Sequence, residues 1–166
     1  EDDDENFFPD NDERALFFCR GVLETVRKLG WSPDIIHCHG WMTSFIPLYV
    51  RHFFNDDPHF EDAKIVFSAY DEPTQELDKD LAKKLTLEGF DKNLLKSLSK
   101  PTTDDLQKFA MGLCDGVAKG SPKLSRAMEN AIKATDKPVL AFQSEAEERL
   151  GAHLEFYQGV LEAALV

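Results

Sequence analysis

Residues 33–50 constrain the fold of this chain more than any other segment. They read Pro-Asp-Ile-Ile-His-Cys-His-Gly-Trp-Met-Thr-Ser-Phe-Ile-Pro-Leu-Tyr-Val, so a β-branched pair runs into a His-Cys-His triplet, and an apolar helical stretch follows the Gly-Trp pair. Short apolar runs are typical of strands buried in a parallel sheet, and open α/β sheets place their ligands where such strands turn into helices. The segment therefore predicts a buried parallel strand whose carboxyl end belongs to a ligand site.

Strand-like and helix-like patterns alternate along the rest of the chain. Apolar runs predict strands within 34–39, 65–69, 115–118 and 138–141, and helical spacing predicts helices at 13–29, 43–54, after 101–105, at 123–134 and from Ser144 onward. Residues 75–98 have the pattern of a polar helical excursion on the surface. Because parallel crossovers are right-handed, we expect an α/β fold with an open, mainly parallel, Rossmann-like sheet and helices on both faces.

Length and composition fit one compact domain. The chain has 166 residues, of which 42% are hydrophobic, enough for a single core. We expect residues 1–12 to be an acidic, poorly ordered terminus and residues 13–166 to be a single α/β domain. Four short strands are few for such a sheet and the chain begins at Glu1 rather than Met, so we expect it to be a piece of a longer protein.

Charge and cysteine usage exclude several classes of protein. The net charge of −12 argues against a nucleic-acid partner, because phosphates would be repelled without a basic stripe. No apolar run is long enough to span a bilayer and no signal-peptide pattern is apparent, so no membrane partner is expected. Cys19, Cys38 and Cys114 make an odd number and sit in apolar stretches, which favours reduced core residues in a cytoplasmic protein.

The 33–50 segment resembles the P-D-[IV]-[IV]-H-x-H-D-W signature of the starch and glycogen synthases, glycosyltransferases that extend α-1,4-glucan from a sugar nucleotide. Three other segments resemble the family in the same order. Residues 14–31 resemble a helix that ends in Gly-Trp, residues 65–71 a V-F-T-x-H-N strand, and residues 114–129 the pattern A-D-x-V-x-x-V-S-P-x-x-x-x-E. Residues 75–100 match loosely and residues 132–166 do not match.

The resemblance implies one half of a GT-B fold, the N-terminal, acceptor-side domain of the two-domain synthases. It implies a glucan or a sugar nucleotide as the bound partner, with ADP-glucose or UDP-glucose as donor and no cofactor. By the same resemblance the substrate-binding positions are His37, His39, Gly40 and Trp41. Of these, Gly40 replaces an Asp that faces the sugar site in the family, and the other three are unchanged.

The other departures also concern chemistry. The His-Asn pair that contacts the donor glucose in the family falls on Tyr70 and Asp71, which are the only catalytic candidates. The family's Lys-x-Gly-Gly phosphate loop has no counterpart, since the sequence contains no Gly-Gly pair, and the nucleotide-side domain is also absent from it. Retaining glycosyl transfer must stabilise an oxocarbenium-like sugar and a departing diphosphate, which requires placed charge on both sides of a cleft.

The candidate residues also allow plainer structural interpretations. His37 and His39 alternate along a strand and share a face, but a metal site would need further ligands that could only be guessed at, so we predict a hydrogen-bonded pair and no metal. Trp41 fits either a core aromatic or a ring beside the sugar. The Asp71-Glu72 pair is typical of a solvated turn.

A similar choice arises at residues 120–122. Gly120 and Ser121 would offer backbone N–H groups to a phosphate at a helix N-terminus, but an N-cap serine explains them fully.

Three functional hypotheses follow. The first is a starch/glycogen synthase-type glycosyltransferase domain that is inactive as this isolated chain. The second is a degenerate, non-catalytic domain that binds glucan or a sugar nucleotide. The third is a protein-interaction module whose resemblance is limited to the fold.

Overall fold

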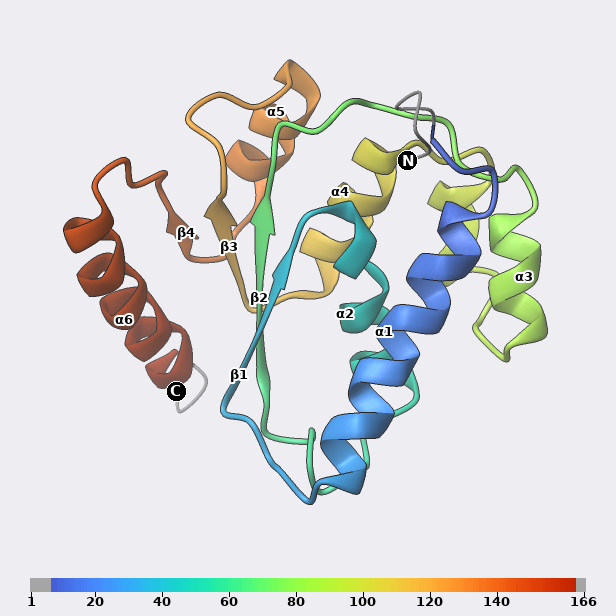
Figure 1. Cartoon of the computed structure of the whole chain (residues 1–166), viewed down its shortest axis with the longest axis horizontal. Helices are drawn as coiled ribbons and strands as arrows, with labels where there is room; N and C mark the ends of the chain where they lie inside the picture. The colour runs from blue at the N-terminus through green and yellow to red at the C-terminus, as the bar shows by residue number, and fades with distance from the viewer. Residues whose placement is uncertain (1–6, 164–166) are drawn as a thin grey trace.

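The sheet has four parallel strands laid side by side in chain order (Figure 1). The computed structural model describes residues 7–163, and the strands are β1 (Ile35–His39), β2 (Lys64–Ala69), β3 (Gly116–Lys119) and β4 (Val139–Leu140). The register pairs His37 with Val66, Val66 with Gly116, and Val117 with Val139. The predicted open, parallel α/β sheet and its four strands are confirmed.

The helices form two unequal layers. In chain order they are α1 (Asn11–Lys28), η1 (Trp41–Thr43), α2 (Phe45–His52), α3 (Leu81–Leu87), η2 (Leu94–Leu98), α4 (Thr103–Leu113), α5 (Arg126–Ala134) and α6 (Ala146–Glu162), where η marks a 3-10 helix. Figure 1 shows α1, α2, α3 and α4 on one side of the sheet and α6 alone on the other. None of the helices between residues 7 and 163 has the length and apolar character needed to cross a membrane.

β1 is an edge strand and is less buried than the sequence predicts. Its neighbour on one side is β2, and among its five residues only Cys38 is buried. Because side chains alternate along a strand, Cys38 faces the α1 side while His37 and His39 face α6. Cys38, Cys19 and Cys114 are all buried and free, as expected of reduced core thiols. Burial raises the pKa of Cys19 to about 12.

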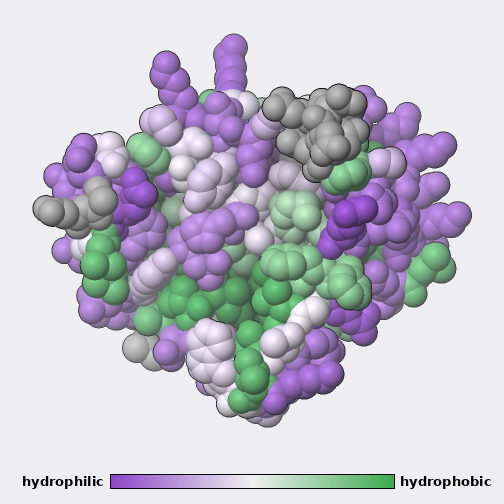
Figure 2. All heavy atoms as spheres, viewed as in Figure 1, coloured by the Kyte–Doolittle hydropathy of each residue, from purple (hydrophilic) through white to green (hydrophobic). Residues whose placement is uncertain are grey.

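α6 packs closely on the opposite face because β3 presents no side chain there at Gly116. A Cβ at this position would lie 2.9 Å from the ring tip of Phe156 and 2.9 Å from a methyl of Val160. Val160 is 2% exposed. One helix nevertheless covers little of a sheet face, and Figure 2 shows hydrophobic residues gathered between α6 and α1, bordered by hydrophilic ones.

The prediction of a polar surface excursion at residues 75–98 is wrong in two respects. The first part of this stretch is extended, and Glu76 forms an antiparallel bridge with Thr102. The later part includes α3 and η2, whose leucines are in the core, with exposed fractions of 2% or less for Leu81, Leu85, Leu95 and Leu98. These four leucine side chains are enough to anchor the segment in the core, although most of its other residues are polar.

The N-terminal part joins this core through an ion-pair cluster. Lys84 of α3 contacts Asp12, Glu13 and Asp78 at 3.1, 2.7 and 2.8 Å. Asn11 and Asp12 begin α1 and are buried. The acidic run at residues 1–5 lies outside the described residues, so the expected disorder of that run stays a prediction.

The α6 packing gives a stability prediction. Gly116→Ala should lower the free energy of unfolding by about 1–3 kcal/mol, because a methyl group forces Phe156 and Val160 away from the sheet. Gly151→Ala is the matched control within α6, where nothing lies within 4 Å of the added Cβ, and it should raise stability by about 0.5–1 kcal/mol. Urea unfolding measures both. Equal effects of the two substitutions would contradict the packing described here.

Candidate functional site

The ends of β1 and β2 come together at the carboxyl edge of the sheet. The His39 Nδ1 atom lies 3.0 Å from the Tyr70 hydroxyl, and the Trp41 N–H donates to a carboxylate oxygen of Glu72 at 3.1 Å. The Gly40 N–H also donates to the Ser68 carbonyl at 3.1 Å. The two segments predicted to form the site therefore lie side by side.

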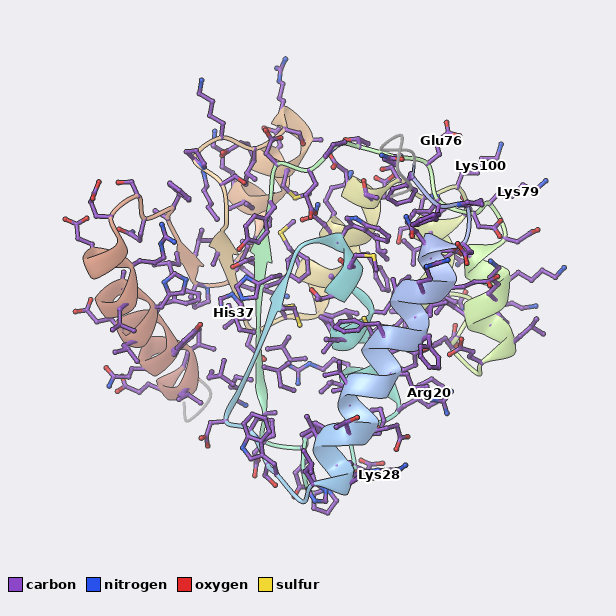
Figure 3. All side chains as sticks on the ribbon, in the orientation of Figure 1. Arg20, Lys28, His37, Glu76, Lys79 and Lys100 are labelled. Carbon is purple, nitrogen blue, oxygen red and sulfur yellow. The ribbon has the colours of Figure 1, made fainter. Side chains whose placement is uncertain are left out.

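His37 lies beneath α6 in a chain of hydrogen bonds. Its Nδ1 is 2.5 Å from the Tyr157 hydroxyl and its Nε2 is 2.8 Å from the Ser68 hydroxyl. Its ring stacks on that of His39 at 4.1 Å and lies 5.9 Å from that of His153. Figure 3 shows His37 between β1 and α6. Burial, reinforced by the two neighbouring histidines, lowers the pKa of His37 to about 3, so the ring is neutral near pH 7.

This environment favours the structural interpretation of the histidine pair. Both ring nitrogens of His37 already have hydroxyl partners. Within residues 7–163, no group of three or more His, Cys, Asp and Glu side chains is arranged to hold a metal ion. Burial also lowers the pKa of His39. The His37 and His39 rings can therefore offer neutral hydrogen-bonding groups at the end of β1.

Gly40 adopts a backbone conformation that other residues rarely accept. Its φ and ψ angles are 69° and 177°, in a region occupied essentially by glycine alone. A Cβ at this position would lie 2.8 Å from one Glu72 carboxylate oxygen and 3.2 Å from the other. Glu72 is half-buried, and this burial raises the pKa of its carboxyl group. A carboxylate supplied by the end of β2 thus stands where a side chain at position 40 would begin.

The Trp41 ring belongs to the core. Trp41 is 7% exposed, and its ring packs on Phe7 with a centroid distance of 5.2 Å. This supports the first of the two interpretations open for Trp41. Its backbone N–H, rather than its ring, takes part in the contact with Glu72.

Asp71 and Ser121 meet at the same edge. Asp71 is exposed and its N–H donates to the Ser121 hydroxyl at 3.0 Å, which agrees with the solvated-turn interpretation for this residue. The same interpretation is wrong for Glu72, which is half-buried and accepts the Trp41 N–H. The prediction that Ser121 caps the following helix is wrong, because Ser125 is the N-cap of α5 and accepts from the Met128 N–H. Gly120 leaves room for the Tyr70 ring, which would lie 2.5 Å from a Cβ at position 120.

A pocket of about 210 Å³ opens beside these residues. His39, Ser68 and Tyr70 form one side, and Arg149 and His153 of α6 form the other. Gly40 and Trp41 are not among its lining residues, so the pocket is narrower than the cleft expected from the sequence. Sequence reasoning missed Arg149, His153 and the position of Glu72. The acid two residues after Tyr70 was a usable signal for Glu72, whereas α6 falls where the family resemblance ends.

The contact between Gly40 and Glu72 can be tested by a double-mutant cycle. Gly40→Asp should lower the free energy of unfolding by about 2–4 kcal/mol, through backbone strain and a second carboxylate placed against Glu72. In a Glu72→Ala background the same substitution should cost at least about 1 kcal/mol less, because only the backbone strain remains. Urea unfolding of the four proteins gives the coupling. A Gly40→Asp penalty that is unchanged by Glu72→Ala would refute the contact.

The histidine cluster predicts how stability depends on pH. His37 and His39 have folded pKa values below the unfolded value of about 6.5, so the unfolded state binds more protons. Their contribution is fully present above that pH and is lost as the pH falls from about 6.5 towards 3. Each histidine adds at most about 1.4 kcal/mol per pH unit to the slope.

The measurement is the urea-derived free energy of unfolding between about pH 7.5 and 5.5, above the range in which carboxylates with ordinary pKa values titrate. His37→Gln keeps hydrogen-bonding groups but removes the titration, so the slope should become shallower. His52 also has a pKa lowered by burial and should leave a residual slope. A variant slope equal to that of the natural chain would count against this account.

Comparison with known proteins identifies sequence relatives of this chain. The sequence profile described as "Starch synthase catalytic domain" matches residues 1–133. Glycogen synthase from Chlorobaculum tepidum is 34% identical over 137 residues, covering 74% of this chain and 27% of that protein. Glycogen synthase from Chlorobium phaeobacteroides is 48% identical over 60 residues, covering 36% of this chain and 12% of that protein. The chain thus spans about a quarter or less of these curated relatives.

A solved structure shares the fold. The catalytic domain of Starch Synthase IV from Arabidopsis thaliana, bound to ADP and acarbose, superposes with a TM-score of 0.64 at 22% identity, covering 82% of this chain and 30% of that one. The four-stranded parallel sheet with its flanking helices matches one half of that GT-B glycosyltransferase. With the family profile matching residues 1–133, the chain belongs to the starch synthase catalytic domain family, which also includes the glycogen synthases.

Proposed function

We propose that this chain is a starch/glycogen synthase-type domain that binds a sugar ligand weakly at the carboxyl edge of its sheet and does not transfer glucose on its own. Within a whole protein of this family, the reaction would be glucosyl transfer from ADP-glucose or UDP-glucose to α-1,4-glucan. A cytoplasmic location is part of the proposal and is supported by three buried, free cysteines.

The contact between Gly40 and Glu72 is the main observation that supports the proposed lack of glucose transfer. Among the described residues, the carboxylate nearest to a side chain at position 40 is that of Glu72, and one of its oxygens already accepts the Trp41 N–H. Burial raises the pKa of Glu72, which weakens it further as a fixed negative charge for an oxocarbenium-like sugar. The carboxylate that the family's chemistry would use is therefore displaced and partly engaged.

Support for the other side of the reaction is incomplete among the described residues, because Arg149 is the one cation of the pocket that no described carboxylate compensates. A departing diphosphate needs preorganised donors and positive charge. Lys119, which lines the pocket, pairs with both carboxylate oxygens of Glu129 at 2.9 and 2.8 Å, so its charge is largely compensated. Removing one oxyanion donor typically costs on the order of a hundred-fold in rate, and such groups act as a unit.

A non-catalytic binding domain is the second candidate, favoured by the residues at the end of β2. Tyr70 stands where the family has a histidine, and its hydroxyl pairs with His39 rather than remaining open. The edge keeps hydrogen-bonding groups that suit sugar hydroxyls. It differs from the first candidate in predicting no transfer even within a whole protein.

The test is the incorporation of labelled glucose from ADP-glucose and UDP-glucose into glycogen. The isolated chain should give no incorporation above a no-protein control, because the carboxylate beside the sugar is displaced and a single guanidinium, that of Arg149, would have to balance the departing diphosphate. An active synthase assayed in parallel shows that the conditions permit transfer. Calorimetry with maltooligosaccharides measures binding separately. Incorporation above the control would overturn the inactivity, and Glu72 would then be the first residue to substitute.

A further inference from the structure

The pocket at the sheet edge has an unusual charge for this protein. The chain carries 31 acidic residues against 19 lysines and arginines, yet none of the acids whose side chains the structure describes lines the pocket. Its polar walls instead contain His39, Tyr70, Lys119, Arg149 and His153. A cavity that excludes acids in so acidic a protein suits an anion rather than a neutral ligand.

Arg149 supplies the positive charge of the pocket. Its Nε donates to the Gln143 carbonyl at 3.3 Å and a terminal nitrogen donates to the Ser144 carbonyl at 3.2 Å. No ion pair joins Arg149 to a carboxylate whose side chain the structure describes. A guanidinium has five N–H donors in a rigid fork, so several remain for a ligand. The two backbone contacts hold the fork in place and reduce the entropy that a ligand would have to remove.

The two histidines of the pocket complement this charge. The Tyr70 hydroxyl can donate to Nδ1 of His39, which leaves Nε2 of the neutral ring as a donor. Nδ1 of His153 lies 2.8 Å from the Arg149 carbonyl, which can only accept, so that nitrogen carries a proton and Nε2 has a lone pair when the ring is neutral. His153 can therefore share one proton with an oxygen of the ligand. Phosphate oxygens are basic enough for such sharing near neutral pH, and sulfate oxygens are not.

The volume of the pocket limits the size of the ligand, and the sequence positions of its lining residues show which part of the chain forms it. At about 210 Å³ the pocket is smaller than the roughly 300 Å³ lower bound for drug-sized ligands, so it fits one tetrahedral anion better than a whole nucleotide. One wall comes from the loop before α6 and from α6 itself, and it contains Phe142, Gln143, Arg149 and His153, all beyond the family-matched residues 1–133. The pocket thus combines residues of the matched segment with a wall, including Arg149, that lies outside it.

We propose that this pocket binds the phosphate group of a small molecule, either inorganic phosphate or a sugar phosphate, with Arg149 as the main charged contact and His39 and His153 as hydrogen-bonding partners. The site shares the sheet edge with the proposed function but does not rest on it. Glucose incorporation and phosphate binding are separate measurements, so either proposal can fail alone.

The experiment is a titration of the whole chain near pH 7 with inorganic phosphate, glucose 1-phosphate and sulfate. Binding is monitored by calorimetry and by the imidazole NMR signals of the histidines. Phosphate should bind saturably with a dissociation constant of about 1 mM or lower and shift the His39 and His153 signals. Arg149→Gln should weaken it about tenfold or more. Arg20→Gln changes the net charge equally on α1, on the other side of the sheet (Figure 3), and should leave binding unchanged.

The outcomes distinguish inorganic phosphate from a sugar phosphate as the ligand, and they distinguish support for the proposal from its failure. Tighter binding of glucose 1-phosphate than of phosphate would support the proposal and identify a sugar phosphate, and the reverse order would identify the inorganic ion. Binding of sulfate as tight as phosphate, equal losses in Arg149→Gln and Arg20→Gln, or an absence of saturable shifts in the natural chain would overturn it. The histidine signals of the natural chain keep the test decisive if Arg149→Gln fails to fold.

Discussion

Four parallel strands laid down in chain order place their crossover helices on one face of the sheet, because each right-handed connection moves in the same direction. Among the described residues, the opposite face is covered by the segment that leaves the last strand. α6 is that segment, and it approaches closely because Gly116 leaves the face flat. The placement of α6 follows from strand order and one small residue, and it brings a second set of side chains to the ligand edge.

The polar centre beneath α6 fixes where this helix sits. Tyr157, His37 and Ser68 form a continuous hydrogen-bonded chain from the helix to the second strand. A buried polar group left without its partner costs about 1–3 kcal/mol, so a shifted helix would lose more than apolar contacts. Apolar packing alone would allow α6 to slide along the sheet, whereas these hydrogen bonds form at one position of the helix only. The same register places Arg149 and His153 beside His39 and Tyr70.

Sequence patterns predicted the elements well, because strands and long helices carry strong apolar periodicity. They failed at residues 75–98, where a few leucines bury a segment that is mostly polar, and at Ser121, because cap geometry depends on a turn that the pattern does not define. The site was predicted in part. The proximity of the β1 and β2 ends followed from the parallel arrangement, but the burial of the Trp41 ring and the placement of Glu72 depend on tertiary contacts.

The glycine at position 40, where the family signature has an Asp, is explained by its contact with Glu72. Considered alone, glycine at position 40 is the loss of a carboxylate from a family signature. In the structure the backbone at this position takes angles that glycine alone accepts readily, and Glu72, in the segment after β2, places a carboxylate oxygen 2.8 Å from where a Cβ would lie. An acidic side chain at position 40 would meet both a conformational penalty and a like charge in a half-buried place. Position 40 and Glu72 therefore constrain each other, and an acid at either one disfavours an acid at the other. The carboxylate at this sheet edge therefore comes from Glu72, and one of its oxygens already accepts the Trp41 backbone N–H.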